Sequence, residues 1–182
     1  ALDVADYPWL GSLGFSGRLS AETLRSALLD FLAEFEPPAN PRVFERNRFA
    51  PLEARGADVF AEVCESCHSA RLVSNDASTR VARSDWERYI FSSTGPLLWA
   101  RGDYERVGVE PYVHARGTRI PALRRIEHKY PYFTNGSARS LDAVLRGVRR
   151  TPSFRHTACG DDCTEPLSEQ QVAALLAFLR LL

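Results

Sequence analysis

A single C-x-x-C-H run at residues 64–68 constrains this chain more than any other feature of its sequence. The spacing of Cys64 and Cys67 brings both thiols to one edge of a porphyrin, where they add across the vinyl groups, and the imidazole of His68 then reaches the iron. A zinc site would want further Cys or His at ligand spacing nearby, and a thioredoxin-like motif would follow a strand in a βαβ pattern. The sequence offers neither context. The run therefore predicts one covalently bound haem c with His68 as the proximal iron ligand.

The second axial ligand of the iron must come from outside the run. The sequence contains no Met, which excludes the His/Met pair that raises haem potential. The iron is then bis-His, bound by His and another oxygen or nitrogen ligand, or five-coordinate. Among the remaining histidines we favour His156, in the irregular segment before the last predicted helix, over His114 and then His128. A tyrosine of segment 131–133 is a minor alternative, because phenolate also binds haem iron.

The second cysteine pair, Cys159 and Cys163, fits a local disulfide. Such a bridge persists in an oxidising compartment, which agrees with a periplasmic or otherwise exported protein. Two free thiols are the alternative. A zinc site is a further interpretation, in which His156 and the two thiols are three of the ligands. No fourth ligand stands out in the sequence.

The size and charge of the chain fit one globular domain with an extension. It has 182 residues, 45% hydrophobic and 25% charged, and 23 Lys plus Arg balance 23 Asp plus Glu. Because the charges balance, the chain has no net positive charge that would attract nucleic acid. No apolar run approaches the ~18 to 20 residues that cross a bilayer, so we expect a soluble chain without a membrane span. The start at Ala1 fits a mature chain after signal-peptide removal or a fragment of a longer one.

Hydrophobic periodicity predicts an all-α, loop-rich chain with almost no strand, and the C-x-x-C-H run makes this a cytochrome c-like domain around one haem. Residues 1–50 form an N-terminal helical extension and linker, and residues 51–182 the cytochrome c domain. Ser20 and Ser140 are predicted helix caps, Pro51 a first-turn proline, and Ser168 with Gln171 a capping box. The predicted helices cover residues 21–35, 51–63, 84–91, 121–126 and 141–148, and a last helix carries an apolar stripe of Val172, Leu175, Leu176, Leu179 and Leu182.

Three segments after the haem run carry a family resemblance: TRIPALRRI at 118–126, YPYFTNGS at 130–137 and SLDAVL at 140–145. Together they resemble the C-terminal haem domain of the bacterial di-haem cytochrome c peroxidase and MauG family. The resemblance covers about residues 50–182, and residues 29–38 are similar to the helix and linker that join the two haem domains in that family. It implies redox partner proteins, with a larger multi-haem or membrane-associated redox complex as one option. Some relatives bind Ca²⁺ between domains, so the resemblance allows a Ca²⁺ site in this chain as well.

The chain also departs from the family pattern. The family's enzymes carry two C-x-x-C-H runs and this chain has one, so the peroxidatic haem and its acid residues have no counterpart. Val148 and Arg149 stand where the electron-donating haem takes Met, and Thr134 replaces the family's His after P-Y-F. No Tyr occurs at 147–150, where MauG-like members place one. A different axial ligand is implied, and we expect no catalytic residue in this chain alone.

Further residues of these segments are candidates for haem contact. Pro121 packs against the haem edge in this interpretation, and Tyr132 lies in the same neighbourhood. Arg119 and Arg124, with Arg125, either pair with the haem propionates or lie on a solvated surface.

The favoured function is electron transfer. The first alternative is a peroxidase or MauG-like oxidase domain, or the electron-relay half of a di-haem enzyme. A haem-based sensor or interaction subunit is a third, which an apolar surface around Trp86, Trp99 or the N-terminal helix would favour.

Overall fold

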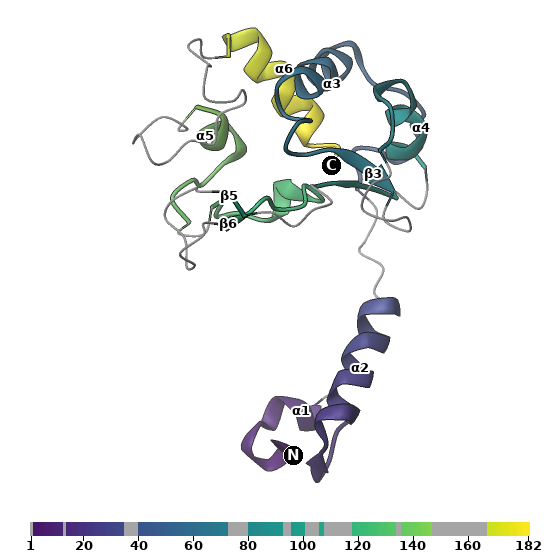
Figure 1. Cartoon of the computed structure of the whole chain (residues 1–182), viewed down its shortest axis with the longest axis vertical. Helices are drawn as coiled ribbons and strands as arrows, with labels where there is room; N and C mark the ends of the chain where they lie inside the picture. Colours follow the sequence, from purple (N-terminus) through teal and green to yellow (C-terminus); the bar gives the residue numbers. More distant parts are fainter. Residues whose placement is uncertain are drawn as a thin grey trace. The chain divides into compact units, whose positions relative to one another are not determined.

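The computed structural model describes residues 2–12, 14–34, 40–72, 80–92, 96–100, 106–107, 118–133, 136–146 and 167–182. The chain divides into two compact units, Ala1–Pro38 and Ala39–Leu182. Helices dominate both units, and the strands of the described part are two or three residues long (Figure 1). The predicted helical, loop-rich fold class is therefore confirmed.

The first unit is built on a short antiparallel pair and two helices. Strand β1 (Leu2–Asp3) pairs with β2 (Arg18–Leu19), and the 3-10 turn η1 (Val4–Asp6) and helix α1 (Pro8–Ser12) lie between them. Helix α2 (Ala21–Glu34) follows. Its predicted cap is present, because the Ser20 hydroxyl accepts a hydrogen bond from the Thr23 amide at 3.0 Å. Val4, Leu10 and Leu19 form the small core of this unit.

Leu24, Leu28, Phe31 and Leu32 form an apolar stripe along α2, and much of this stripe lies outside that core. Leu24 packs against it, whereas Leu28, Phe31 and Leu32 are each more than half exposed. Burial within the first unit therefore accounts for only the first turn of the stripe.

The second unit is organised around the crossing of two helices, α3 (Pro51–Val63) and α6 (Glu169–Leu179), which lie side by side (Figure 1). Helix α3 begins at Pro51 as predicted. The capping box of α6 is also present, since the Gln171 amide donates to Ser168 Oγ at 3.2 Å and the Ser168 amide donates to Gln171 Oε1 at 2.9 Å. Gly56 sits where the helices cross, and a Cβ atom at that position would overlap the Ala174 carbonyl.

An aromatic cluster fills the space beside this crossing. Its members are Phe60, Trp86, Trp99 and Phe178, with the rings of Trp86 and Trp99 centred 4.6 Å apart and those of Phe60 and Trp99 5.1 Å apart. All four side chains are at most 2% exposed. Trp86 is delivered by the 3-10 turn η2 (Arg83–Asp85) and helix α4 (Trp86–Ile90). These tryptophans are core residues and provide no apolar surface for a partner.

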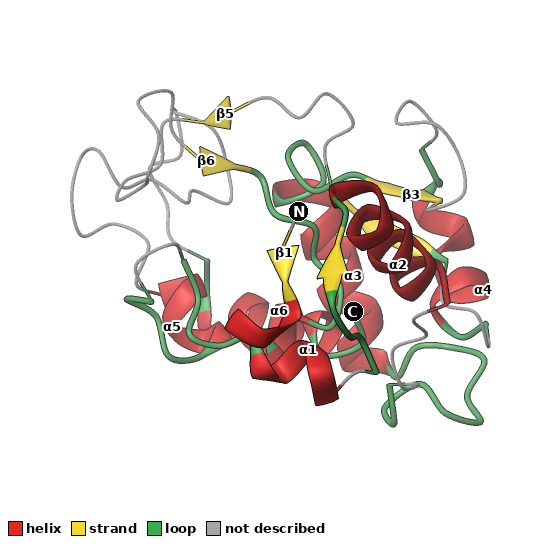
Figure 2. Ribbon diagram, turned by 90° about the horizontal axis from the view of Figure 1, so that it is seen from below, coloured by secondary structure: helices red, strands yellow, loops and turns green. Residues whose placement is uncertain are grey.

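Two short antiparallel pairs complete the second unit (Figure 2). Strand β3 (Ala70–Leu72) pairs with β4 (Leu97–Trp99), with Ala70 opposite Trp99, and β5 (Arg106–Val107) pairs with β6 (Thr118–Arg119). The 3-10 turn η3 (Ile126–His128) and helix α5 (Leu141–Arg146) follow. Ser140 caps α5, since its Oγ accepts from the Ala143 amide at 3.0 Å.

The helical turn predicted at 121–126 is wrong. These residues are extended or irregular, and the 3-10 turn begins only at Ile126. The Leu123 amide donates to the Trp99 carbonyl of β4 at 3.0 Å, so it is not available for a helical hydrogen bond. Arg125 has a positive φ of 54°, which a helix does not tolerate.

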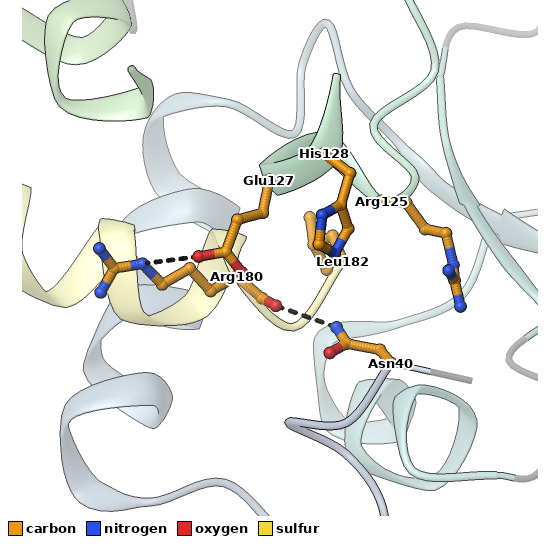
Figure 3. Close-up of a pocket in the computed structure, with 6 residues that line it drawn as sticks. All are labelled: Asn40, Arg125, Glu127, His128, Arg180 and Leu182. Carbon is orange, nitrogen blue, oxygen red and sulfur yellow. Dashed lines mark hydrogen bonds and ion pairs between the residues drawn. The ribbon is translucent and has the colours of Figure 1, made fainter. Parts of the chain in front are cut away.

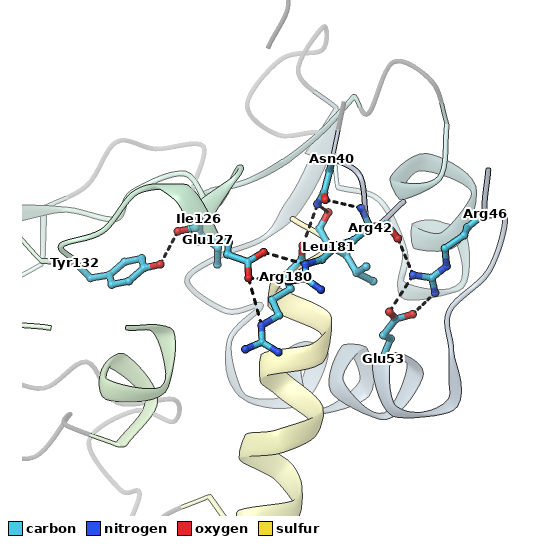
Figure 4. Close-up of polar contacts among 9 residues, drawn as sticks. All are labelled: Asn40, Arg42, Arg46, Glu53, Ile126, Glu127, Tyr132, Arg180 and Leu181. Atoms are coloured by element: carbon cyan, nitrogen blue, oxygen red, sulfur yellow. Dashed lines mark hydrogen bonds and ion pairs between the residues drawn. The ribbon is translucent and has the colours of Figure 1, made fainter. Parts of the chain in front are cut away.

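Residues 40–50, which we expected to be a linker, belong to the second unit. The Asn40 side chain donates to the carbonyls of Arg180 and Leu181 at 2.9 and 3.1 Å, at the end of α6 (Figure 4). Phe49 is 8% exposed and its amide donates to Glu87 Oε1 at 2.8 Å. The spread of Pro and Arg along this segment gave no helical or strand period, so the sequence did not reveal its packing.

Candidate haem-binding site

The C-x-x-C-H run begins where α3 ends. Cys64 is the C-cap of that helix, and its amide still donates to the Phe60 carbonyl. Its own carbonyl then accepts from the amides of Cys67 at 3.1 Å and His68 at 2.8 Å. These bonds wind residues 64–68 into a tight turn, which brings both cysteines and the histidine close together on one short piece of backbone.

The two thiols and the imidazole differ in exposure. Cys64 is half-buried, Cys67 is exposed, and neither forms a disulfide. Burial, and to a lesser extent the nearby Cys67, raise the pKa of the Cys64 thiol to about 12. His68 is only 8% exposed. The imidazole is therefore largely shielded from water.

The chain after His68 is held on both sides by backbone hydrogen bonds. The Ala100 amide donates to the Ser69 carbonyl at 3.0 Å, and the Val81 amide donates to the Ala70 carbonyl at 2.9 Å. The Leu123 amide donates to the Trp99 carbonyl on β4. Through β4, segment 120–125 is thus tied to the strand that follows the haem run.

The residues of that region that we predicted to contact the haem differ in how exposed they are. Pro121 is exposed and Arg124 is half-buried, while only the backbone of Arg119 is described, in β6. Tyr132 is half-buried and its hydroxyl donates to the Ile126 carbonyl at 2.7 Å (Figure 4). Burial, and then the charge of Glu127, raise the pKa of this phenol, so it is neutral at ordinary pH. Haem contact by these residues stays a prediction.

Several predicted residues lie outside the described part of the chain. They are Thr134, Val148, Arg149, His114, His156, Cys159 and Cys163. The distal ligand, the disulfide and the alternative zinc site therefore all stay predictions. Among the described ranges no group of three His, Cys, Asp or Glu side chains is placed to hold a metal ion.

His128 lies apart from the haem run. It is exposed and lines a surface pocket with Asn40, Arg125, Glu127, Arg180 and Leu182 (Figure 3). Glu127 in this pocket is held by Arg42, which donates from Nε and Nη2 at 3.0 and 3.1 Å, and by Arg180 at 3.5 Å. No residue of 64–68 lines this pocket.

Sequence reasoning missed one residue beside the motif, Arg71. It is 7% exposed, and His68 and Arg71 are the only buried polar side chains in the described part of the chain. The available signal was its position: Arg71 stands between Ala70 and Leu72, two apolar residues of a strand that packs on the core.

These features fit a covalently bound haem. Cys64 and Cys67 would hold the group by thioether bonds, and His68 would supply the proximal nitrogen. A buried imidazole and two thiols, carried on one hydrogen-bonded turn of five residues, are the donor set that such a group needs.

Three observations bear on the wider classification. No helix in the described residues combines the length and apolar character that crossing a membrane requires. A search of the curated proteins gave no match. The model of one protein family, described as Cytochrome c, matches residues 53–182. The matched range includes nearly all of α3, the haem run, the β3–β4 pair and α6. This chain belongs to the cytochrome c family.

Proposed function

We propose that this chain is a mono-haem electron-transfer cytochrome whose iron is bound by His68 and His156. The observation that carries the proposal is the burial of His68 at the end of the hydrogen-bonded turn that also carries Cys64 and Cys67. Because the chain contains no Met, the second axial ligand of the iron has to be another group, and imidazole is the strongest donor that remains.

The bound haem supplies a one-electron change between ferric and ferrous iron. The chain's own residues restrict that chemistry to electron transfer. Cys64 and Cys67 fix the porphyrin, and the closed aromatic core beside α3 keeps water away from that side of the motif. Two strong ligands leave no position on the iron for a substrate, and a second imidazole gives a lower potential than Met does.

A second candidate function is the electron-relay half of a di-haem peroxidase or MauG-like enzyme. It is favoured by the bond between Leu123 and Trp99, which ties the TRIPALRRI segment to the strand after the haem run. This is the segment that resembles the C-terminal haem domain of that family. In either function the partners are redox proteins, in the periplasm or another exported space, where a Cys159–Cys163 disulfide would persist.

Optical spectra of the ferric and ferrous protein, with and without carbon monoxide, test the ligand set. We expect a low-spin iron that ignores carbon monoxide. In His156→Ala we expect a high-spin iron that binds it, while His128→Ala, on the exposed pocket, keeps the wild-type spectrum. A wild-type spectrum in His156→Ala would contradict this ligand, and the same measurement on His114→Ala then tests the alternative.

Peroxide separates the two functions. A wild-type iron that is high-spin, binds carbon monoxide and reacts with hydrogen peroxide would favour the peroxidase-like candidate. The mass of the intact protein completes the test, since one haem per chain and a loss of two hydrogens at Cys159 and Cys163 are expected.

A further inference from the structure

Arg71 is a buried cation to which no carboxylate of the described residues gives a counter-charge. Its side chain is 7% exposed, and its Nε atom is buried with no hydrogen-bond partner. Among the described residues no carboxylate forms an ion pair with it. Arginine is almost never buried unless it is paired, because removing its charge from water costs several kcal/mol, on the order of the whole stability of a domain. The fold therefore calls for an anion at this position.

Two acidic side chains, one in the haem run and one on α3, are engaged by other arginines. Glu65, in the haem run itself, accepts from Arg80 Nη2 at 2.8 Å. Asp58 on α3 accepts from Arg83 at 2.9 Å. The other buried guanidinium nitrogen, Nε of Arg83, thus belongs to a side chain that has an ion pair, and this guanidinium also lies over the rings of Phe49 and Trp86 at 5.2 and 5.3 Å. Arg71 differs from Arg83 in having neither kind of contact in the described residues.

The strand places Arg71 on the face away from the aromatic core. Side chains alternate along a strand, and Ala70 and Leu72 both pack against the core cluster. Arg71 and Leu98, its partner on β4, therefore share the opposite face of the pair. Arg71 lies three positions after His68 in the sequence, so their Cα atoms lie at most about 11 Å apart. The side chain is within reach of a large group that is attached at His68.

We infer that Arg71 binds a propionate of the covalently attached haem. The haem carries two carboxylates, and the planar guanidinium fork matches a carboxylate in a bidentate pair. Haem attachment at Cys64 and Cys67 would bring this anion to the only buried arginine of the described chain and would complete the hydrogen bonding of its Nε atom. This inference rests on the haem site and does not depend on which residue is the distal ligand.

The pair has a measurable effect on the iron. An ionised propionate favours ferric iron, and its protonation raises the midpoint potential. Arg71 keeps the propionate ionised at lower pH, so the potential should change little with pH around neutrality. Other titratable or charged groups on the elements around β3 are His68, the Glu65–Arg80 pair and Arg124, while β4 contributes none.

The test compares the holoproteins of wild type, Arg71→Gln and Arg71→Lys with Arg80→Gln as the matched control. Arg80→Gln removes the same charge near the haem run from an exposed side chain. In Arg71→Gln we expect a lower midpoint potential at high pH and a new pH step, across which the potential rises as the propionate takes up its proton. Arg71→Lys should move that step back toward the wild type, and Arg80→Gln should show the wild-type pH profile.

Infrared difference spectra of the wild-type protein, with haem labelled by ¹³C at the propionate carboxyls, give a readout that needs no variant. We expect one propionate to stay ionised well below the ordinary range of a carboxylic acid, about pH 4 to 5. Two propionates that both titrate in that ordinary range would overturn the inference, as would equal pH profiles in Arg71→Gln and Arg80→Gln. An unchanged haem spectrum in Arg71→Gln shows that His68 still binds the iron, which separates this result from a failure of the ligand assignment.

Discussion

Gly56 of α3 lies directly against the backbone of Ala174 of α6, with no room for a side chain between them. A Cβ atom at residue 56 would overlap the Ala174 carbonyl and approach Phe178 Cβ to 2.8 Å. Helix α3 ends just before the haem run, and α6 packs along α3. The contact at Gly56 therefore sets the distance between these two helices.

Gly56→Ala should therefore reduce stability by about 3 kcal/mol, because the two helices have to separate and the packing of the aromatic cluster is lost. Thermal unfolding of the holoprotein, followed by tryptophan fluorescence, measures the change. Gly11→Ala is the control, since a Cβ atom there meets nothing within 4 Å. Equal melting curves for Gly56→Ala and the wild type would show that the helices tolerate a wider crossing.

Trp86→Phe should destabilise the second unit by about 2 kcal/mol. The Trp86 Nε1–H group donates to the Val81 carbonyl at 3.0 Å, and both groups are buried, so phenylalanine leaves the carbonyl without this partner and a gap beside Trp99. Trp9→Phe alters a tryptophan that is 60% exposed and should change stability by less than about 0.5 kcal/mol. Urea unfolding distinguishes them. Similar midpoints for the two variants would mean that the Trp86 bond contributes nothing.

Glu53 should make stability depend on pH in the acid range. Its carboxylate accepts from Arg46 and from the Ala50 amide at 2.7 Å (Figure 4). Burial alone would raise its pKa, but the bonds from Arg46 and Ala50 outweigh burial and hold the pKa below the usual range. The folded state thus prefers the ionised form more than the unfolded state does. This stabilisation is fully present above the unfolded pKa and is lost as pH falls through the folded one.

Glu53→Gln should consequently be less stable than the wild type by about 1 kcal/mol at neutral pH, and the two proteins should converge in acid. Unfolding midpoints between pH 7 and the acid limit of the folded state give the comparison. Glu22→Gln, which removes the exposed pair with Arg25, should follow the wild type throughout. A constant difference between wild type and Glu53→Gln at every pH would speak against the ion pair as its source.

Asn40→Ala should lower stability by about 1 kcal/mol. The side-chain amide of Asn40 donates to the carbonyls of Arg180 and Leu181, which have no further helical turn to satisfy them. The exposed Asn47→Ala is the control. Hydrogen exchange of the amides in the last turn of α6 measures the effect locally, and equal exchange in both variants would contradict a capping role for Asn40.

Local signals predicted the helices well. Ser20, Pro51 and the Ser168–Gln171 capping box each mark a helix start that the structure has, because these signals act within one turn of the chain. The haem run is equally local, since attachment and ligation need five consecutive residues. Its identification required no knowledge of the fold.

Features that depend on distant partners were not predictable in this way. Segment 121–126 has a helix-like composition, yet the Leu123 amide is taken by Trp99, which lies far away in the sequence. Arg71 looked like an ordinary surface arginine because its burial depends on how β3 pairs with β4. Asn40 and Phe49 sat in a segment without periodicity, and only their long-range contacts place them in the second unit.

The hydrogen bonds from Ala100 to Ser69 and from Val81 to Ala70 hold the backbone just after His68 from two sides. A ligand carried on such a backbone has little freedom to follow the iron when the iron gains or loses charge. In the proposed haem site, the structural reorganisation that accompanies each electron would be small on the side of His68, and little of the driving force between redox partners would be lost to it. The short β3–β4 pair would in this way set how fast the protein exchanges electrons, although none of its residues binds the iron.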